Sequence, residues 1–578
     1  MSSAPTSSTP PPSPRLSEPS EAPEAPEAPE PSGPSRIRRL PLAGVLRPGK
    51  PSDIWFKPAS SVVVATAIPN LTLLAIGRLD LVMYTMAGSF CALYAHNLPY
   101  AARARALAGV VVGMLASVGV AMVAASLTTS AVVLVAVGAL LAAAQKTLCD
   151  ATRIGPPGHL IFTFISSATL FAPQAIGQVP GHLALTLGAG AVAWLVGMAP
   201  ALVRPHGPER RATARALHAA AAYAEAAGPG RERARPGAAA AVHAAWQSLL
   251  ATGARTAARR ALERLVIRAE EALSAPSAAD PAQLRALADG LRGTGAVPRP
   301  GGVRREADDE LLGVEAVLAA APARQPLWRR LGPGSPLLPI ALRTAVGCAL
   351  AGYASLALGV GRPYWALVTA ASLYQANVTL TWNRGVQRVV GNLVGVLAFA
   401  AIVPLAHLSQ AALIVCCLAL AFGAEALMAR NYWMGSVCVT PMALLVTEFA
   451  RFQQPGELIL DRVVDTFVGA LLGIVAAMAV TNRRAADHIE LAIDATDRAR
   501  ARAEQALAAP LPTPGTLRPA RRGLTAALVD LRTAHDAAAG EWWQRALPEE
   551  RVMAAEQAGH RTLAATVRGT ERGERVRV

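Results

Sequence analysis

Residues 389–407 read VVGNLVGVLAFAAIVPLAH, a run that holds no Asp, Glu, Lys or Arg. An α-helix needs about 20 apolar residues to cross roughly 30 Å of hydrocarbon, so this run predicts a transmembrane helix. The connections at 77–79 and 429–431 are so short that some helices are expected to be broken or re-entrant, which leaves the expected count at roughly 10 to 12 spans. Similar apolar runs recur along the chain, at roughly 59–77, 79–97, 106–127, 130–147, 159–177, 182–203, 338–360, 364–381, 389–407, 410–429, 431–449 and 463–481.

These runs predict an all-α, polytopic membrane protein with two similar six-helix halves. The composition agrees, because hydrophobic residues make up 53% of the 578-residue chain while aromatic residues make up only 5%. Ala, Val, Leu and Gly supply the apolar mass, as in tightly packed membrane helices. The net charge of +16 comes mainly from Arg residues beside the apolar runs. Such residues orient a protein in the bilayer and attract anionic lipid, so the expected partner is the lipid bilayer and no nucleic acid is expected.

Basic residues at the ends of the apolar runs also predict the orientation. Those before the first run, from Arg36 to Lys57, place the N-terminus in the cytoplasm under the positive-inside rule. Arg103, Arg204 and Arg384 then fall on the inner side, and an even number of spans in each half returns the chain to the cytoplasm. We therefore expect a multi-pass protein of the plasma membrane (the cell inner membrane) with both termini cytoplasmic.

The chain divides by composition into five segments. Residues 1–50 form a disordered Pro/Ser/Glu-rich tail with a basic juxtamembrane end, and 51–203 form the first membrane half, a degenerate repeat. A cytoplasmic helical domain is expected at 204–335, the second membrane half at 336–482 and a cytoplasmic helical tail at 483–578. Two interpretations of the cytoplasmic segments stay open. They form a small bundle that packs together, on a second copy of the chain or on an accessory protein, or they bind a regulatory ligand.

Two short patterns occur in the same order in both halves. GRLDLVMYT at 77–85 corresponds to GRPYWALVT at 361–369, and further on an Arg precedes two glycines four residues apart. Because both halves begin on the same side, the repeat is parallel, and in transporters with internal repeats the substrate site lies between the related halves. Glycines at this spacing let helix backbones approach closely. Helix packing, with a substrate-facing role as the alternative, is therefore expected of Gly109, Gly113, Gly391, Gly395, Gly469 and Gly473.

The second half resembles the fusaric acid resistance family, the FUSC-like or aromatic acid exporter-type membrane proteins. The resemblance covers roughly residues 338 to 481, and the first half shares it more loosely, since it lacks the Tyr-Trp pair and the Arg-x-x-Asp of the last span. It implies efflux of small organic anions, including aromatic carboxylic acids, driven by protons, and two membrane halves with cytoplasmic domains between and after them. The matching stretches are LRTA at 342–345, YWALVT at 364–369, RGVQRVVGNLVG at 384–395 and DRVVDTFVG at 461–469.

Three charged residues of the second half are candidates for a substrate or proton pathway. Arg388 and Arg462 head similar stretches, and the expected topology places them at opposite faces of the membrane. An Arg at a span end usually extends to the lipid headgroups, and the alternative is that its guanidinium group binds a substrate carboxylate. Asp465 follows Arg462 by one helical turn. It either forms a local ion pair with Arg462 or takes up a proton during transport.

Glu425 lies inside an apolar run, where an unpaired carboxylate costs about 2–3 kcal/mol or more. It either couples proton movement to transport or pairs with an arginine, for which the sequence offers Arg430, Arg388 and Arg343. Arg343, about one turn into its own span, is itself a pathway candidate.

Trp365 and Thr369 are four residues apart, so they share one face of a helix. This partly polar face either lines a pathway for an aromatic acid or makes ordinary interhelical hydrogen bonds. Both interpretations stay open.

No motif points to catalysis. The chain has no Walker A, HExxH or GxSxG motif, so neither ATP-driven transport by this chain alone nor an enzyme is expected. Its six cysteines form no CxxC and have no His at metal-binding spacing, so no metal or other cofactor is expected. The residues and the resemblance together predict secondary efflux of small organic acids by alternating access, with proton coupling through Glu425 or Asp465. The alternative is a non-transporting membrane scaffold whose cytoplasmic helical domains bind a partner.

Overall fold

A computed structural model describes residues 42, 44–49, 54–152, 154–251, 256–274, 276–298, 337–375, 377–449, 452–480, 485–509, 514–539 and 548–575. All regular elements in these ranges are helices, which confirms the all-α prediction. Most of the predicted tail segment 1–50, namely residues 1–41, 43 and 50, lies outside the described residues.

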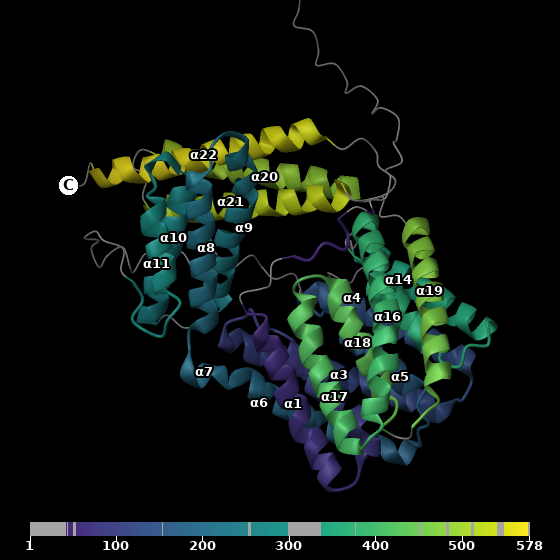
Figure 1. Ribbon diagram of the computed structural model, residues 1–578. Coiled ribbons are helices and arrows are strands. Elements are labelled where there is room, and N and C mark those ends of the chain that lie inside the picture. Colours follow the sequence, from purple (N-terminus) through teal and green to yellow (C-terminus); the bar gives the residue numbers. More distant parts are fainter. Residues whose placement is uncertain are drawn as a thin grey trace, which may run out of the picture.

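The first membrane half contains six helices, of which the second and the fifth are short (Figure 1). Its second helix is short and flanked by the single 3-10 turns η1 (Leu79–Leu81) and η2 (Phe90–Leu93), and its fifth helix is short as well. A 3-10 turn, η3 (Ile176–Gln178), leads into the sixth helix, and α7 (Pro200–Val203) follows it. The six helices are α1 (Phe56–Ala75), α2 (Val82–Ser89), α3 (Tyr100–Leu127), α4 (Ala131–Thr152), α5 (Leu160–Leu170) and α6 (Val179–Met198).

The second membrane half repeats this order, again with a short second and a short fifth helix. The predicted span 364–381 is interrupted after Tyr374, because the side chain of Asn377 accepts a hydrogen bond from the Leu380 backbone and starts a new helix. That helix therefore begins well before residue 389. The six helices are α14 (Leu338–Ala357), α15 (Tyr364–Leu373), α16 (Val378–Ala406), α17 (Gln410–Met428), α18 (Tyr432–Val446) and α19 (Pro455–Ala479).

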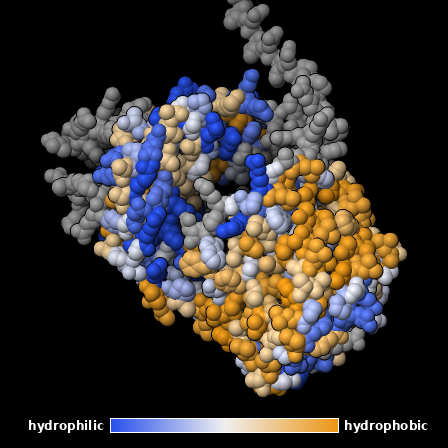
Figure 2. Space-filling model, in the orientation of Figure 1, coloured by the Kyte–Doolittle hydropathy of each residue, from blue (hydrophilic) through white to orange (hydrophobic). Residues whose placement is uncertain are grey.

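Seven helices in the described residues are long and apolar enough to cross a membrane. The short helices of both halves, at 79–93, 160–170, 364–373 and 432–446, are apolar but do not reach that length. The structure therefore supports a polytopic membrane protein and does not confirm twelve spans. Figure 2 shows that the surface over the membrane helices is largely hydrophobic, as lipid contact requires.

The two halves pack against each other in a reciprocal way. The first helix of each half packs on the fourth helix of the other, α1 on α17 and α14 on α4. Within each half, the short second helix packs on the sixth helix, α2 on α6 and α15 on α19. This arrangement is what a parallel internal repeat produces, and it brings α15, α16, α18 and α19 together in the second half.

The second-half glycines lie where helices touch. A Cβ atom on Gly469 would lie 2.4 Å from the backbone oxygen of Ala366, and one on Gly391 would lie 2.7 Å from that of Trp433. Gly395 and Gly473 have similarly close neighbours. In the first half, Gly113 faces Phe162, whereas Gly109 has nothing within 4 Å of an added Cβ atom, so the packing role expected for Gly109 is wrong.

The segments that are predicted to be cytoplasmic form a helical bundle that lies to one side of the membrane helices in Figure 1. Figure 2 shows much more hydrophilic surface on it. The predicted apolar stripe, including Leu262, Leu265 and Val266, is buried in the first group of helices. The helices are α8 (Gly207–Glu225), α9 (Gly228–Ala251), α10 (Ala257–Ser274) and α11 (Pro281–Gly290), with the turn η4 (Pro276–Ala278), and then α20 (Ala485–Ala508), α21 (Pro514–Ala539) and α22 (Glu549–Arg575).

A buried ion pair joins the two groups of helices in this bundle. Arg521 of α21 donates to Glu270 of α10 over 3.0 Å, and both side chains are at most 5% exposed. Nearby, Arg522 stacks on the Trp246 ring, 4.0 Å from its centroid. Burial lowers the pKa of His560, which lines the same junction, to about 4, so this side chain is neutral near pH 7. The segments before and after the second membrane half thus form one structure.

Chain connectivity distinguishes two ends of the membrane helices. At the bundle end, the chain passes from α6 and α7 into α8 and from α19 toward α20. At the far end lie the connections between α14 and α15, α16 and α17, and α18 and α19. Under the predicted orientation the bundle end is cytoplasmic.

A short N-terminal strap, residues 44–49, is attached to the bundle end of the second half. The Val45 backbone oxygen accepts hydrogen bonds from Gln387 (2.9 Å) and Asn431 (3.1 Å), and the Leu46 oxygen accepts one from the Trp433 indole (3.0 Å). The Gly49 backbone donates to the Arg430 oxygen over 2.7 Å. The strap therefore lies next to Tyr432, the first residue of α18.

Candidate anion site

Four helices of the second half enclose a group of buried polar side chains. Trp365 comes from the short helix α15, Arg388 from α16 and Arg462 from α19, and all three are at most 5% exposed. Tyr432 of α18 completes the group and is 6% exposed. The site is thus shielded from solvent in this conformation.

Arg462 is a buried cation without an ion-pair partner among the described residues. Its Nε and Nη1 atoms are buried and donate no hydrogen bond, and its guanidinium carbon lies 5.2 Å from the centroid of the Trp365 ring. Asp465, one turn along α19, instead accepts a hydrogen bond from the Ser355 hydroxyl through Oδ1 over 2.6 Å. The other carboxylate oxygen of Asp465 is buried without a partner. The local ion pair between Arg462 and Asp465 is therefore not formed.

Arg388 is the second buried cation. Its Nη1 atom donates to the Tyr432 hydroxyl over 3.1 Å, while its Nε atom is buried and donates no hydrogen bond. Arg384, one turn earlier on α16, stacks on the same Tyr432 ring, 3.5 Å from its centroid. Tyr432 thus holds two arginines that lead from the bundle end toward the interior.

Asn392 lies between the two buried arginines. Its amide donates to the Thr466 hydroxyl over 2.9 Å and accepts from the Thr440 hydroxyl over 2.7 Å. Arg388 is one turn before Asn392 on α16 and Arg462 is one turn before Thr466 on α19, so the antiparallel helices place the two cations on either side of this contact. The expectation that Arg388 and Arg462 lie at opposite membrane faces is wrong, because both helices begin earlier than the hydrophobic runs suggest.

Three further buried polar atoms on these helices form no hydrogen bond within 3.5 Å among the described residues. These are the Trp365 indole nitrogen, the Thr369 hydroxyl and the Ser436 hydroxyl. A set of unpaired N–H and O–H groups beside two guanidinium groups is suited to bind a carboxylate, since Arg can donate two parallel hydrogen bonds to its oxygens. No cluster of three His, Cys, Asp or Glu residues able to hold a metal ion occurs in the described part of the chain.

Two of the predicted pathway residues lie apart from this group. Arg343 donates twice to the backbone oxygen of Val480, at 2.9 and 2.6 Å, and so satisfies the end of α19 at the bundle end. Glu425 lies on α17, which packs on α1, and its carboxylate forms no hydrogen bond or ion pair with any described residue. The structure therefore pairs Glu425 with none of the arginines considered from the sequence.

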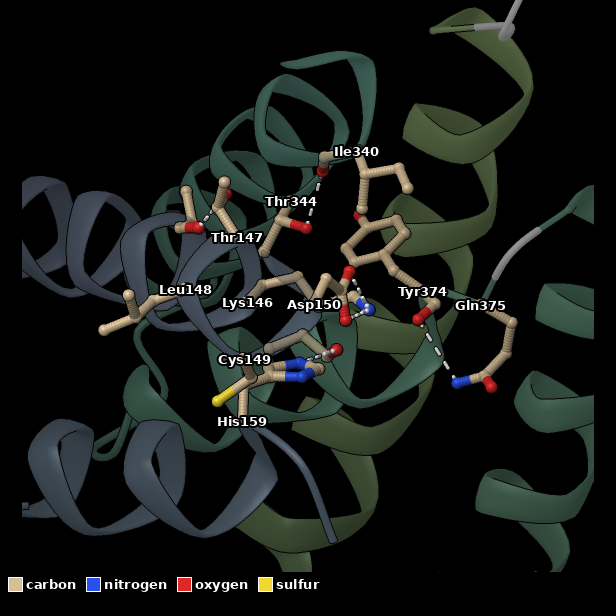
Figure 3. A network of polar contacts seen from close by, with 12 residues as sticks. Lys146, Thr147, Leu148, Cys149, Asp150, His159, Ile340, Thr344, Tyr374 and Gln375 are labelled. Atoms are coloured by element: carbon tan, nitrogen blue, oxygen red, sulfur yellow. Dashed lines mark hydrogen bonds and ion pairs between the residues drawn. The ribbon is translucent and has the colours of Figure 1, made fainter. Parts of the chain in front are cut away.

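A polar contact also crosses the junction of the two halves at the bundle end (Figure 3). Lys146 of α4 forms an ion pair with Asp150 on the same helix, at 2.9 and 2.7 Å, and is turned inward rather than toward lipid headgroups. His159, just before α5, contacts the backbone oxygen of Ala371 in α15 over 3.1 Å. The short helix α15 is thus held by the first half on one side and by α19 on the other.

At the far end, a chain of polar contacts reaches the Trp365 ring. Arg362 forms an ion pair with Asp461 (3.0 Å), donates to the side-chain oxygen of Gln453 and lies 5.4 Å from the Trp365 centroid. Both Arg362 and Arg462 thus lie close to the Trp365 ring. Gln453 in turn donates to the backbone oxygen of Thr447 over 3.0 Å.

Sequence reasoning missed Tyr432, Ser355 and Glu448. Glu448 follows the apolar run that forms α18, is 2% exposed, and lies 2.7 Å from the His407 ring nitrogen. Glu448 lies within the expected apolar run 431–449, so its carboxylate is a sequence feature that could have marked it as a candidate. Tyr432 and Ser355 carry no charge, so only the packing of the helices identifies them.

Comparison with known proteins supports the assignment of the second half. Residues 349–476 match the family model for fusaric acid resistance protein-like proteins. The uncharacterized membrane protein YvaC of Bacillus subtilis (strain 168) is 26% identical over 455 residues, which is 72% of this chain and 72% of that relative. No solved structure matches the chain. The fusaric acid resistance-like segment contains Trp365, Arg388, Arg462 and Asp465, which are the residues of the candidate anion site.

Proposed function

We propose that the protein is a secondary transporter that exports small organic anions, including aromatic carboxylic acids, by alternating access. Arg462 and Arg388 bind the carboxylate, and the Trp365 ring and the Thr369 hydroxyl contact the rest of the molecule. The observation that carries the proposal is the buried Arg462 guanidinium, with two N–H donors that no described residue accepts.

The energetic argument is direct. Removing an ion from water costs several kcal/mol even after the protein relaxes, and roughly 1–3 kcal/mol more for each buried donor left without an acceptor. An anion in this space would offset that cost through charge-assisted hydrogen bonds. A membrane scaffold has no need of unpaired buried cations, so this feature favours transport over the scaffold alternative.

Proton coupling is proposed to involve Asp465 rather than Glu425. Asp465 lies within the site, and one of its oxygens is free to take a proton. When Asp465 is ionised it competes with the substrate carboxylate for the field of Arg462, and when protonated it does not. Glu425 lies on α17, which contributes no side chain to the group of buried polar residues and packs on α18 and α1.

Uptake of radiolabelled 4-hydroxybenzoate into proteoliposomes tests the proposal. The acid is almost wholly ionised above about pH 6, so leakage of the neutral form is small. Arg462→Gln and Arg388→Gln are expected to reduce carrier-mediated uptake by about 100-fold, the loss of two charge-assisted hydrogen bonds. Arg105→Gln is the matched control. Arg105 precedes the first-half glycine pair as Arg388 precedes the second, but it is exposed, so uptake should be unchanged.

Two results would contradict the proposal. One is normal uptake by both site variants. The other is absence of transport by the wild-type protein for a panel of aromatic and aliphatic carboxylates, with no difference in their accumulation between a deletion strain and the complemented strain.

A further inference from the structure

His407 and Glu448 form a buried acid–base pair at the far end that the proposed transport step does not use. The Nε2 atom of His407 lies 2.7 Å from Oε2 of Glu448. The Glu448 side chain is fully buried, whereas His407, at the end of α16, is 29% exposed. The other oxygen of Glu448, Oε1, is buried without a partner among the described residues. The pair thus joins a solvent-accessible imidazole to a carboxylate held inside the protein.

We infer that the His407–Glu448 pair is a proton-binding site whose protonation strengthens anion binding from the far end; this rests on the proposed function. With neutral imidazole the pair carries one negative charge, located on Glu448. When the imidazole takes a proton, the pair becomes an imidazolium–carboxylate with no net charge. A buried negative charge repels an incoming anion strongly in a medium of low dielectric constant, and its neutralisation removes that repulsion.

A series of contacts between neighbouring residues connects the pair to the anion site. Glu448 follows Thr447, whose backbone oxygen and hydroxyl both accept hydrogen bonds from Gln453, at 3.0 and 3.3 Å. Gln453 accepts from Arg362, and Arg362 lies over the Trp365 ring. The Arg462 guanidinium carbon lies 5.2 Å from the centroid of the same ring. A change of charge at Glu448 therefore acts at the end of a chain of contacts that leads to the anion-binding guanidinium.

Other titratable or charged groups on the neighbouring elements are few. The thiols of Cys416 and Cys417 lie on α17, Arg362 precedes α15, and Glu457 and Asp461 lie on α19. Arg362 and Asp461 are paired with each other at 3.0 Å, and Glu457 is exposed. Phe452, from the connection before α19, covers the His407 ring with a centroid distance of 4.5 Å. His407 is thus the imidazole through which the buried carboxylate exchanges protons with the far side.

Two substitutions fix the pair in its two charge states. Glu448→Gln keeps a hydrogen-bonding side chain but removes the negative charge. It therefore imitates the protonated pair, whose net charge is zero. His407→Gln also keeps a hydrogen-bonding side chain but removes the imidazole that takes up the proton. The dissociation constant of 4-hydroxybenzoate is measured for each purified protein in detergent from about pH 6 to about pH 8.

The proteins are expected to differ in their affinity for 4-hydroxybenzoate and in how that affinity depends on pH. The wild-type protein is expected to bind 4-hydroxybenzoate about tenfold more tightly at about pH 6 than at about pH 8, because one negative charge near the anion is neutralised. Glu448→Gln binds tightly at every pH, and His407→Gln binds weakly at every pH. Glu457→Gln, an exposed carboxylate at the same end, keeps the wild-type response. A wild-type pH response in both Glu448→Gln and His407→Gln would assign it to another group, such as Asp465, and overturn the inference.

Proton binding is also measured without the anion. Infrared difference spectra between the wild-type protein and Glu448→Gln isolate the carboxylate bands of Glu448 over the same pH range. A pH-dependent shift of these bands supports the proton site even if 4-hydroxybenzoate does not bind, which would count against the proposed function alone. Bands that do not change with pH overturn the inference and leave the proposed function untouched.

Discussion

Arg103 in the first membrane half and Arg462 in the second are both buried arginines with opposite surroundings. Arg103 is 4% exposed, and it donates to the backbone oxygens of Ala95, His96 and Gly197. Arg462 is 1% exposed and leaves two donor atoms without partners. Arg103 links separate chain segments through its hydrogen bonds. Arg462 has donor atoms for which the described residues supply no acceptor.

The same contrast holds for the stacked pairs of the two halves. In the first half, Tyr84 of α2 stacks on His182 of α6 with a centroid distance of 3.8 Å, and Gln174 bonds to both. In the second half, Trp365 of α15 stacks on Arg462 of α19 at the corresponding helices. The second and sixth helices of the first half are thus joined by a hydrogen-bonded stack, whereas the same two helices of the second half hold an unsatisfied cation. The difference indicates that the first half mainly supports the structure and the second half carries the chemistry.

The largest expected effect comes from replacing the two buried arginines by Met. Arg103→Met leaves three backbone oxygens without a donor and is expected to cost about 3 kcal/mol or more of stability. Arg462→Met removes an uncompensated buried charge, which is neutral or stabilising by about 1–4 kcal/mol, while 4-hydroxybenzoate uptake is lost. Thermal unfolding of the purified variants in detergent measures both. A fall in stability for Arg462→Met as large as that for Arg103→Met would mean that both arginines are structural.

Much of this contrast could be foreseen from the sequence. The order of apolar runs, the parallel repeat and the concentration of charge in the second half all follow from composition and spacing. The site residues Trp365, Thr369, Arg388, Arg462 and Asp465 were all among the candidates. The sequence could not provide their arrangement. An Arg interrupts a hydrophobic run in the sequence in the same way whether it reaches lipid headgroups or is buried inside the protein.

The helix boundaries explain the wrong expectations. Asn377 starts α16 eleven residues before the hydrophobic run at 389, so Arg388 lies well inside the helix and not at its end. Glu425 is a charged residue in an apolar run, but only the structure shows that α17 packs on α18 as well as on α1 while Glu425 contacts none of the site arginines. Glycine spacing is equally limited, since the same pattern marks a tight contact at Gly391 and open space at Gly109.

The glycines give the second test of the contrast between the halves. At Gly391, an added methyl group would meet the Ser436 side chain at 2.6 Å and the Trp433 backbone oxygen at 2.7 Å. Gly391→Ala is therefore expected to destabilise the protein by about 1–3 kcal/mol, because the helices must move apart. Gly109→Ala meets nothing and should be neutral or stabilising by about 0.5–1 kcal/mol through helix propensity. Unfolding temperatures of the two variants provide the comparison, and equal losses would contradict it.

The smallest expected effect concerns two arginines that occupy corresponding places in the repeat, Arg78 and Arg362. Arg78 pairs with Asp80 at the surface, where the two side chains are 56% and 51% exposed. Arg362 pairs with Asp461 at 24% and 20% exposure, and it also covers Trp365. Arg362→Ala is expected to cost about 1 kcal/mol, the upper range for a partly exposed pair, and to change 4-hydroxybenzoate binding, because one face of Trp365 loses its cation. Arg78→Ala should change neither the unfolding temperature nor binding. If the two variants behaved alike, the far end of the second half would have no special connection to the anion site, and the division of roles between the halves would have to rest on Arg388 and Arg462 alone.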